Sequence, residues 1–208
     1  MLGFLSNSEE GFTKLIKETE FFDIEKLSET HEITGFSCGN DKDDTELSNF
    51  LKENALVEQG QKINATYVAV LKGTKKVVGY VTTLNDRLIV STKEREKMKI
   101  SGEYLDFPAL KIGRLAVDKR HERKHIGTTL FRAAVGTALE SSGCRFLIVD
   151  SYPKSLDFYI KKGFVRNEIQ NQKVKMLKEK ADGSVDTTGE KARQTISLRI
   201  DLVNTPKE

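Results

Sequence analysis

The residues best suited to chemistry lie in one stretch that runs from an apolar strand through a basic loop into a helix. The pattern predicts a strand over residues 112–117, a loop over 118–125 and a helix over 126–142. A helix N-terminus presents backbone N–H groups without acceptors and the positive end of the helix dipole. A loop that leads into such a terminus can therefore bind a phosphate or a diphosphate.

The side chains around the predicted helix start are cationic or small. Arg123, Lys124 and His125 place basic groups before the helix, and Gly127 permits a close approach of the backbone. The hydroxyl of Thr128 can donate to a phosphate oxygen. The spacing fits neither Gly-x-x-x-x-Gly-Lys-Ser/Thr nor Gly-x-Gly-x-x-Gly, so it predicts anion binding without NTPase or dehydrogenase chemistry. An ordinary strand–loop–helix turn with a charged surface is the alternative.

Charge is distributed unevenly along the 208 residues, whose formal net charge is +3. Residues 1–60 carry 14 acidic and 5 basic side chains, whereas residues 111–132 carry seven Lys or Arg against two acidic residues. A basic cluster can attract nucleic acid, an anionic cofactor or acidic lipid, and the alternative is a solvated charged face. Two further basic sets are Lys93, Arg95, Lys97 and Lys99, and Lys173, Lys175, Lys178 and Lys180.

Composition limits the class of protein. Hydrophobic residues make up 38% and charged residues 31%, which is typical of a folded domain and not of a disordered chain. No apolar run approaches the roughly 20 residues of a membrane span, and the N-terminal residues lack the apolar core of a secretory signal. We therefore expect a cytoplasmic protein without a membrane partner. Cys38 and Cys144 lack metal-ligand spacing, so we expect them to be buried small hydrophobes and expect no metal.

The rest of the chain predicts the elements that must position this segment. Strands are predicted over residues 22–27, 66–71, 77–84, 109–118, 145–150 and 196–202, and helices over 41–56, 126–142 and 155–162. The segment 91–98 fits a short helix or a loop. Strands that alternate with helices and include a hairpin predict a mixed α/β sheet.

Two short segments late in the chain carry patterns of their own. The helix over 155–162 should face the core with Leu156, Tyr159 and Ile160 and end at Gly163. The last strand should have one apolar face and one wet face. The residues of that wet face are Ser197, Arg199 and Asp201.

Three segments, in this order, resemble the GCN5-related N-acetyltransferase (GNAT) family. Residues 35–40 and 46–56 are similar to the start of its toxin-type subgroup. The run that begins Arg114-Leu-Ala-Val-Asp and ends His125-Ile-Gly-Thr-Thr-Leu is similar to the acetyl-CoA-binding segment. Residues 155–164 resemble the family's Ala-x-x-Phe-Tyr-x-x-x-Gly-Phe segment. Toxins of this subgroup acetylate the amino group of aminoacyl-tRNA and are usually paired with a small DNA-binding antitoxin.

The resemblance implies a mixed, mostly antiparallel central sheet that is flanked by helices and has splayed central strands. The length of the chain suits one domain, and its pattern predicts an accessory arm over residues 1–20. With the resemblance, we expect a single N-acetyltransferase domain over 21–208 with a C-terminal strand extension. Acetyl-CoA is the implied cosubstrate. The implied candidate partners are aminoacyl-tRNA, a small antitoxin and a second copy of the chain in a homodimer.

The resemblance also implies roles for individual residues. The backbone of Leu115 and Val117 would hold the pantetheine, and the Val117 N–H would donate to the thioester oxygen. Tyr159 would be the general acid because an ordinary phenol is protonated at neutral pH, and a packed core aromatic is the alternative. The predicted acetyl-CoA contacts are Leu115, Ala116, Val117, Glu122, Arg123, Lys124, His125, Ile126, Gly127, Thr128, Ser155 and Tyr159.

The loop differs from the family pattern Gln/Arg-x-x-Gly-x-Gly/Ala. Only Gly127 of that pattern is present, Glu122 places a carboxylate in the loop, and His125 places a Cβ where glycine is usual. Asp118, Glu122 and His121 are candidate bases only by proximity in sequence, and the α-amine of an aminoacyl ester needs no dedicated base. Two alternatives stay open: an N-acetyltransferase of a small amine or protein, and a non-catalytic acyl-CoA-binding regulatory protein.

Overall fold

The computed structural model describes residues 19–141, 143–169 and 195–204. Most of the predicted arm and the basic set between Lys173 and Lys180 lie outside these residues. The chain divides into two compact units. The first unit is Gly3–Asn85 with Leu110–Ser142, and the second is Asp86–Ala109 with Gly143–Glu208 and Met1–Leu2.

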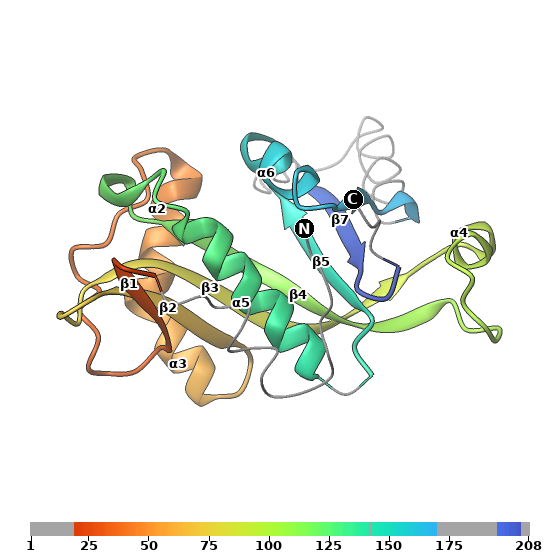
Figure 1. Ribbon diagram of the computed structural model, residues 1–208, viewed down its shortest axis with the longest axis horizontal. Coiled ribbons are helices and arrows are strands. Elements are labelled where there is room, and N and C mark those ends of the chain that lie inside the picture. Colours follow the sequence, from red (N-terminus) through yellow and green to blue (C-terminus); the bar gives the residue numbers. More distant parts are fainter. Residues whose placement is uncertain (1–18, 142, 170–194, 205–208) are drawn as a thin grey trace, which may run out of the picture. The chain divides into compact units, whose positions relative to one another are not determined.

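Hydrogen bonding orders the strands β1-β2-β3-β4-β5-β7-β6 in one seven-stranded, mostly antiparallel sheet, which confirms the predicted fold class. The elements mainly in the first unit are β1 (Phe22–Lys26), α2 (Lys42–Asn49), η1 (Phe50–Asn54), α3 (Ala55–Gly60), β2 (Ala65–Leu71), β3 (Val77–Ile89), β4 (Asp106–Val117), η2 (Lys119–His121) and α5 (Ile126–Glu140) (Figure 1). Those of the second unit are α4 (Thr92–Lys97), β5 (Phe146–Ser151), η3 (Pro153–Ser155), α6 (Leu156–Ile160), β6 (Val165–Arg166) and β7 (Ile196–Asp201). The last residues of β3 (86–89) and the first residues of β4 (106–109) belong to the second unit.

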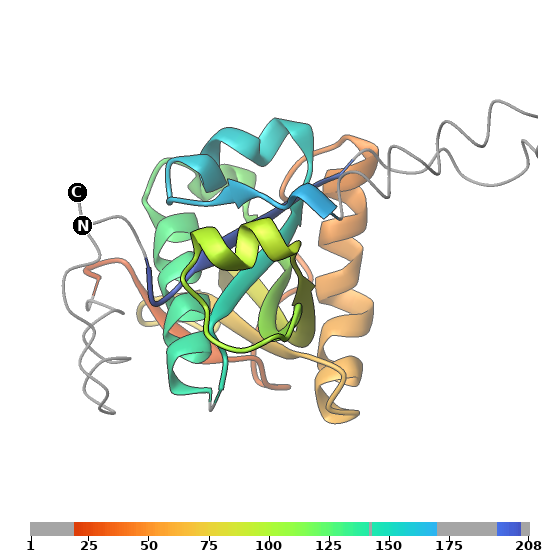
Figure 2. The same ribbon diagram turned by 90° about the vertical axis from the view of Figure 1, so that its right-hand side faces the viewer.

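In the first unit, helices pack on both faces of the strands. Figure 2 shows α5 on one side and the α2–α3 helix on the other. Tyr80 is fully buried on the α2–α3 side, where its hydroxyl donates to the Leu47 carbonyl at 2.7 Å. Gly79 faces α5, and a Cβ there would lie 2.8 Å from Ile126 Cγ2 and 2.9 Å from Leu130 Cδ1. A glycine is therefore what allows α5 to pack this close to β3.

The helix predicted over 41–56 forms, but it contains a π-helical turn that the sequence did not predict. Asp41 caps its start by accepting a hydrogen bond from the Asp44 N–H at 2.8 Å. The turn Phe50–Asn54 then inserts an extra residue into the helical repeat. Phe50 and its neighbour Leu51 are both buried in the core of the first unit.

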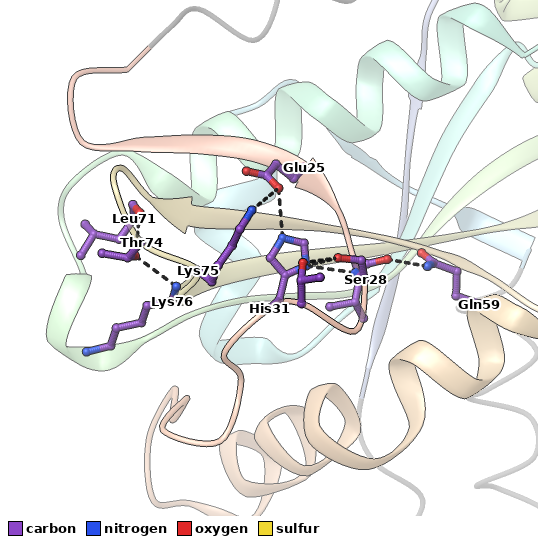
Figure 3. A network of polar contacts seen from close by, with 10 residues as sticks. Glu25, Ser28, His31, Gln59, Leu71, Thr74, Lys75 and Lys76 are labelled. Carbon is purple, nitrogen blue, oxygen red and sulfur yellow. Dashed lines mark hydrogen bonds and ion pairs between the residues drawn. The ribbon is translucent and has the colours of Figure 1, made fainter.

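The segment between β1 and α2 is fixed by a polar network around a buried histidine (Figure 3). His31 Nδ1 accepts from the Ser28 N–H at 3.0 Å, so its Nε2 carries the proton and donates to the Glu25 carboxylate at 3.1 Å. Gln59 donates to the Leu27 carbonyl at 2.8 Å. These bonds fix the segment that leads to residues 35–37. Residues 35–37 contact the loop between β4 and α5.

The second unit corrects the prediction of a wet face on the last strand. Ser197 and Arg199 of β7 are each only 8% exposed. The Arg199 guanidinium lies 2.8 Å from the carboxylate of Glu94, which is buried on α4. The segment 91–98 is indeed a short helix, with a capping box between Ser91 and Glu94. Arg199 on the polar face is therefore buried in an ion pair with α4. Alternation along one strand cannot predict such a partner.

Two smaller predictions also need correction. Ile160, which was expected to face inward, is 45% exposed because α6 is a short helix that buries only part of its surface. Cys38 and Cys144 are half-buried rather than buried, and they do not form a disulfide. No helix within the described residues is long and apolar enough to cross a membrane.

Candidate functional site

The loop between β4 and α5 has a backbone conformation that L-amino acids rarely adopt. Arg123 has φ +62° and His125 has φ +59°, both in the left-handed region. Each such non-glycine residue costs about 1–2 kcal/mol. Left-handed residues in a turn create concave arrays of N–H groups that bind anions. Strain of this kind persists where the surrounding structure holds it, and it is concentrated at functional sites.

The start of α5 presents free backbone donors. The first helical hydrogen bond runs from the Thr129 N–H to the His125 carbonyl at 3.0 Å. Among the residues that the structure describes, the N–H groups of His125, Ile126, Gly127 and Thr128 donate to no acceptor. Four adjacent donors at the positive end of a 15-residue helix form a site that suits a phosphate group.

Cationic side chains surround these donors. Lys119, Arg123, Lys124 and His125 are exposed, and none of them forms an ion pair with another described residue. Glu122 is exposed as well. The loop therefore combines free N–H groups with unneutralised positive charge. The side chain of His125, which adds a Cβ where the family has glycine, is exposed.

Asp118 holds the base of the loop, a role that sequence reasoning missed. Its buried carboxylate accepts from the Arg120 Nε at 2.9 Å and Nη2 at 2.6 Å, and from the Ser37 N–H at 3.4 Å. The same Nη2 donates to the Gly35 carbonyl at 2.6 Å, and the Lys119 N–H donates to the Ser37 carbonyl at 2.9 Å. These bonds fasten the loop to a segment that lies far away in the sequence.

The three candidate bases differ in their surroundings. Burial raises the pKa of Asp118, but hydrogen bonds from Arg120 and Ser37 outweigh it, so the pKa lies below its ordinary value. Burial and repulsion from Lys124 lower the pKa of His121, which makes this imidazole a weaker base. Glu122 is exposed on the loop. Among the described residues, no group of three His, Cys, Asp or Glu side chains could hold a metal ion.

The end of β4 holds the three residues predicted to contact the pantetheine. Ala116 is buried in the core of the first unit, and Leu115 and Val117 are half-buried. The structure also places Arg114 over the Phe50 ring, with its guanidinium carbon 3.6 Å from the ring centroid. The first unit thus brings together the predicted residues of the β4–α5 segment, from Leu115 to Thr128.

The remaining predicted residues, Ser155 and Tyr159, lie in the second unit. Tyr159 is 5% exposed and packs edge-on against Phe158 and Phe164, with ring centroids 5.1 Å and 5.4 Å away. Its hydroxyl forms no hydrogen bond with any described residue. Burial raises the pKa of Tyr159 far above the ordinary value of 10. The phenol therefore stays protonated at neutral pH, and its O–H, which has no acceptor within the described ranges, can donate.

Comparisons with known proteins agree with this geometry. Residues 20–164 match the model of the acetyltransferase (GNAT) family. A tyrosine-to-phenylalanine mutant of KacT is similar in structure, with 24% identity, a TM-score of 0.65, and coverage of 88% of this chain and 96% of that one. AtaT complexed with acetyl-methionyl-tRNAfMet has 22% identity and a TM-score of 0.64, with coverage of 86% and 94%. AtaTR bound with acetyl-CoA has 19% identity and a TM-score of 0.61, with coverage of 89% and 96%.

At these identities the solved structures show a shared fold, whereas the family model spans most of the chain. Together with the strand–loop–helix geometry of the first unit, this match identifies the protein as an N-acetyltransferase of a class that uses acetyl-CoA. The chain belongs to the acetyltransferase (GNAT) family.

Proposed function

We propose that the protein transfers the acetyl group of acetyl-CoA to the α-amino group of an aminoacyl-tRNA, as the toxin of a toxin–antitoxin pair. The use of acetyl-CoA as the acetyl donor is supported by the start of α5. There, N–H groups and cationic side chains have no partner among the described residues. The acceptor half is supported by the toxin-type pattern of residues 35–40 and 46–56. It is also supported by the fold shared with AtaT, whose complex contains an acetylated aminoacyl-tRNA.

The first unit would bind the donor. The N–H groups from His125 to Thr128 would hold the diphosphate of coenzyme A, and Arg123 and Lys124 would add charge. The backbone of β4 at Leu115 and Val117 would hold the pantetheine. The Val117 N–H would donate to the thioester oxygen as negative charge develops there.

Tyr159 would supply the proton that the leaving sulfur of coenzyme A takes up. The amine nitrogen bonds to the thioester carbon, the carbon–sulfur bond breaks, and the sulfur leaves with the bond electrons. The phenol O–H gives its proton to this sulfur, the amine loses a proton to solvent, and the phenolate takes a proton back from solvent. A free amine that is partly neutral needs no dedicated base, so we assign this role to none of Asp118, His121 and Glu122. Ser155 would contact the cofactor from the start of α6.

The direct test is incubation of the protein with isotope-labelled acetyl-CoA and total aminoacylated tRNA. After nuclease digestion, mass spectrometry should detect N-acetylaminoacyl-adenosine that carries the label. Deacylated tRNA and the Tyr159→Phe variant are the matched controls. Label that appears only on small amines or on protein would overturn the tRNA assignment and favour ordinary N-acetyl transfer.

A partner protein follows from the same proposal. Other solved structures that are similar to this chain include AtaT bound to the C-terminus of the antitoxin AtaR and a KacTA–DNA complex. We expect a small antitoxin to bind this chain and suppress acetyl transfer, and a homodimer to form in solution. Sedimentation of the purified chain, alone and with the product of an adjacent gene, tests both expectations.

A further inference from the structure

Arg114 carries a positive charge that the proposed mechanism does not use. Its guanidinium lies 3.6 Å from the centroid of the Phe50 ring, and the side chain is half-buried. It forms no hydrogen bond or ion pair with any residue that the structure describes. The ring interacts with the guanidinium face, but the N–H groups along its edge have no acceptor in the part of the chain that the structure describes.

The ring below this guanidinium is itself held in place. Phe50 is 4% exposed and begins the π-helical turn of the α2–α3 helix. It stacks on Tyr80 with ring centroids 6.2 Å apart and an interplanar angle of 26°. The π-helical turn therefore presents a fixed aromatic surface, and the surface orients the guanidinium plane. A planar fork of oriented donors is the arrangement that binds phosphate or carboxylate oxygens with two parallel bonds.

The position of Arg114 on β4 indicates which molecule would supply the phosphate or carboxylate oxygens. Arg114 shares a strand face with Ala116, which is buried in the α2–α3 core. The opposite face of the neighbouring β3 is filled by α5 at Gly79. Arg114 itself is half-buried, so part of its side chain is open to a ligand. It lies about 10 Å along the strand from Val117, where we place the thioester.

We infer that Arg114 binds a phosphodiester at the end of the acceptor tRNA and so selects acceptors that carry a phosphate near the reacting amine. This inference rests on the proposed function. The covalent path from an α-amine through its ester and ribose to the nearest phosphate is long enough to span from Val117 to Arg114. Arg114 is a specificity residue in this scheme and takes no part in the bond exchange.

The test compares two acceptors with one amino acid: the aminoacylated trinucleotide CCA and the aminoacyl ester of adenosine, which has no phosphate. Wild type should use the trinucleotide with a kcat/KM about tenfold to a hundredfold higher, the range of a charge-assisted contact. Arg114→Gln should lose most of this preference. Its KM for acetyl-CoA and its rate with the adenosine ester should not change.

Three further variants sharpen the result. Arg114→Lys keeps the charge without the fork and should retain only part of the preference. Phe50→Leu keeps an apolar side chain without the ring face and should reduce the preference by about threefold to fivefold. Arg132→Gln removes one exposed charge from α5 and should leave the preference unchanged.

The outcomes separate this inference from the proposed function. Equal loss of activity by Arg114→Gln on both acceptors would show a structural role and overturn the inference, as would an unchanged preference. If wild type acetylates neither aminoacylated tRNA nor the trinucleotide, the proposed function fails and the inference fails with it. Thermal unfolding of each variant identifies any general loss of folding.

Discussion

The β4–α5 loop and the surroundings of Tyr159, the two regions to which we assign chemistry, are built in opposite ways. The loop is exposed, and its donors are backbone N–H groups whose directions depend on the left-handed Arg123 and His125. Tyr159 is buried between Phe158 and Phe164, and a single hydroxyl is its only functional group. A site made of backbone donors should tolerate changes of side chain, whereas a site made of one atom should not. This difference would explain how the loop can depart from the family pattern and still bind a diphosphate.

The largest expected effect is that of Tyr159→Phe, which removes the hydroxyl and keeps the ring. We expect kcat to fall about a hundredfold to a thousandfold, within the range of general acid catalysis. Stability should not change, because the hydroxyl has no partner among the described residues. Thiol release from acetyl-CoA measures the rate, and calorimetry with coenzyme A should give the wild-type affinity. A variant as active as wild type would show that Tyr159 is only a packed aromatic.

Asp118→Ala should have the next largest effect because it removes the acceptor that anchors the loop. We expect the free energy of unfolding to fall by about 2–3 kcal/mol, since Arg120 loses its buried partner but stays half-exposed to solvent. Affinity for coenzyme A should fall as well. Urea unfolding and calorimetry measure the two effects. Glu122→Ala, an exposed neighbour, should change stability by less than about 0.5 kcal/mol, and an equal loss in both variants would contradict an anchoring role.

Gly79→Ala tests whether the position of α5 matters to the loop. The added Cβ would meet Ile126 and Leu130 below 3 Å, so these side chains or α5 itself must move, at a cost of about 1–3 kcal/mol. Because Ile126 begins α5, affinity for coenzyme A should fall with stability. At Gly60 a Cβ meets nothing within 4 Å, so Gly60→Ala is the matched control and should keep both properties. If Gly79→Ala loses stability but keeps its affinity for coenzyme A, binding at the loop does not depend on how α5 packs against β3.

Acid should weaken the fold through two paired carboxylates. Burial raises the pKa of Asp118 and of Asp201, but hydrogen bonds from Arg120 and Arg145 outweigh it, so both pKa values lie below the ordinary value near 3.8. A carboxyl with a lowered folded-state pKa stabilises the fold above its unfolded pKa, and this contribution is lost as the pH falls through the folded pKa. The melting temperature should therefore drop between pH 5 and more acidic values, by about a few degrees. Asp118→Ala should show a smaller drop, and an identical profile would contradict the assignment.

His125→Gly should have the smallest effect. Relief of the left-handed strain and the entropy cost of glycine act in opposite directions, which leaves a gain of about 0.5–1 kcal/mol in stability. His125→Ala keeps the Cβ and should gain nothing. Both variants should bind coenzyme A within about threefold of wild type, a change below about 1 kcal/mol. A much larger loss in both would show that the imidazole is a ligand and that the loop does not rely on its backbone alone.

Local patterns determined much of this protein. The apolar spacing of residues 126–139 and the apolar run before Asp118 predicted the strand, loop and helix, because helical and strand periodicity are properties of neighbouring residues. The three ordered motifs predicted the family, and the match of residues 20–164 to the family model confirms this prediction. The roles of Tyr159 and of the loop residues stay predictions that the experiments above will test.

Only the tertiary structure decided which distant residues support the site. It brought Gly35 and Ser37 to Asp118 and Arg120, and it placed Phe50 beneath Arg114. It also buried Arg199 against Glu94, where alternation along the strand had predicted a wet face. These contacts join residues far apart in the chain, and their energy comes from burial and pairing in three dimensions. A periodic pattern records which face of an element is apolar, but it does not record which charged side chain will meet that face.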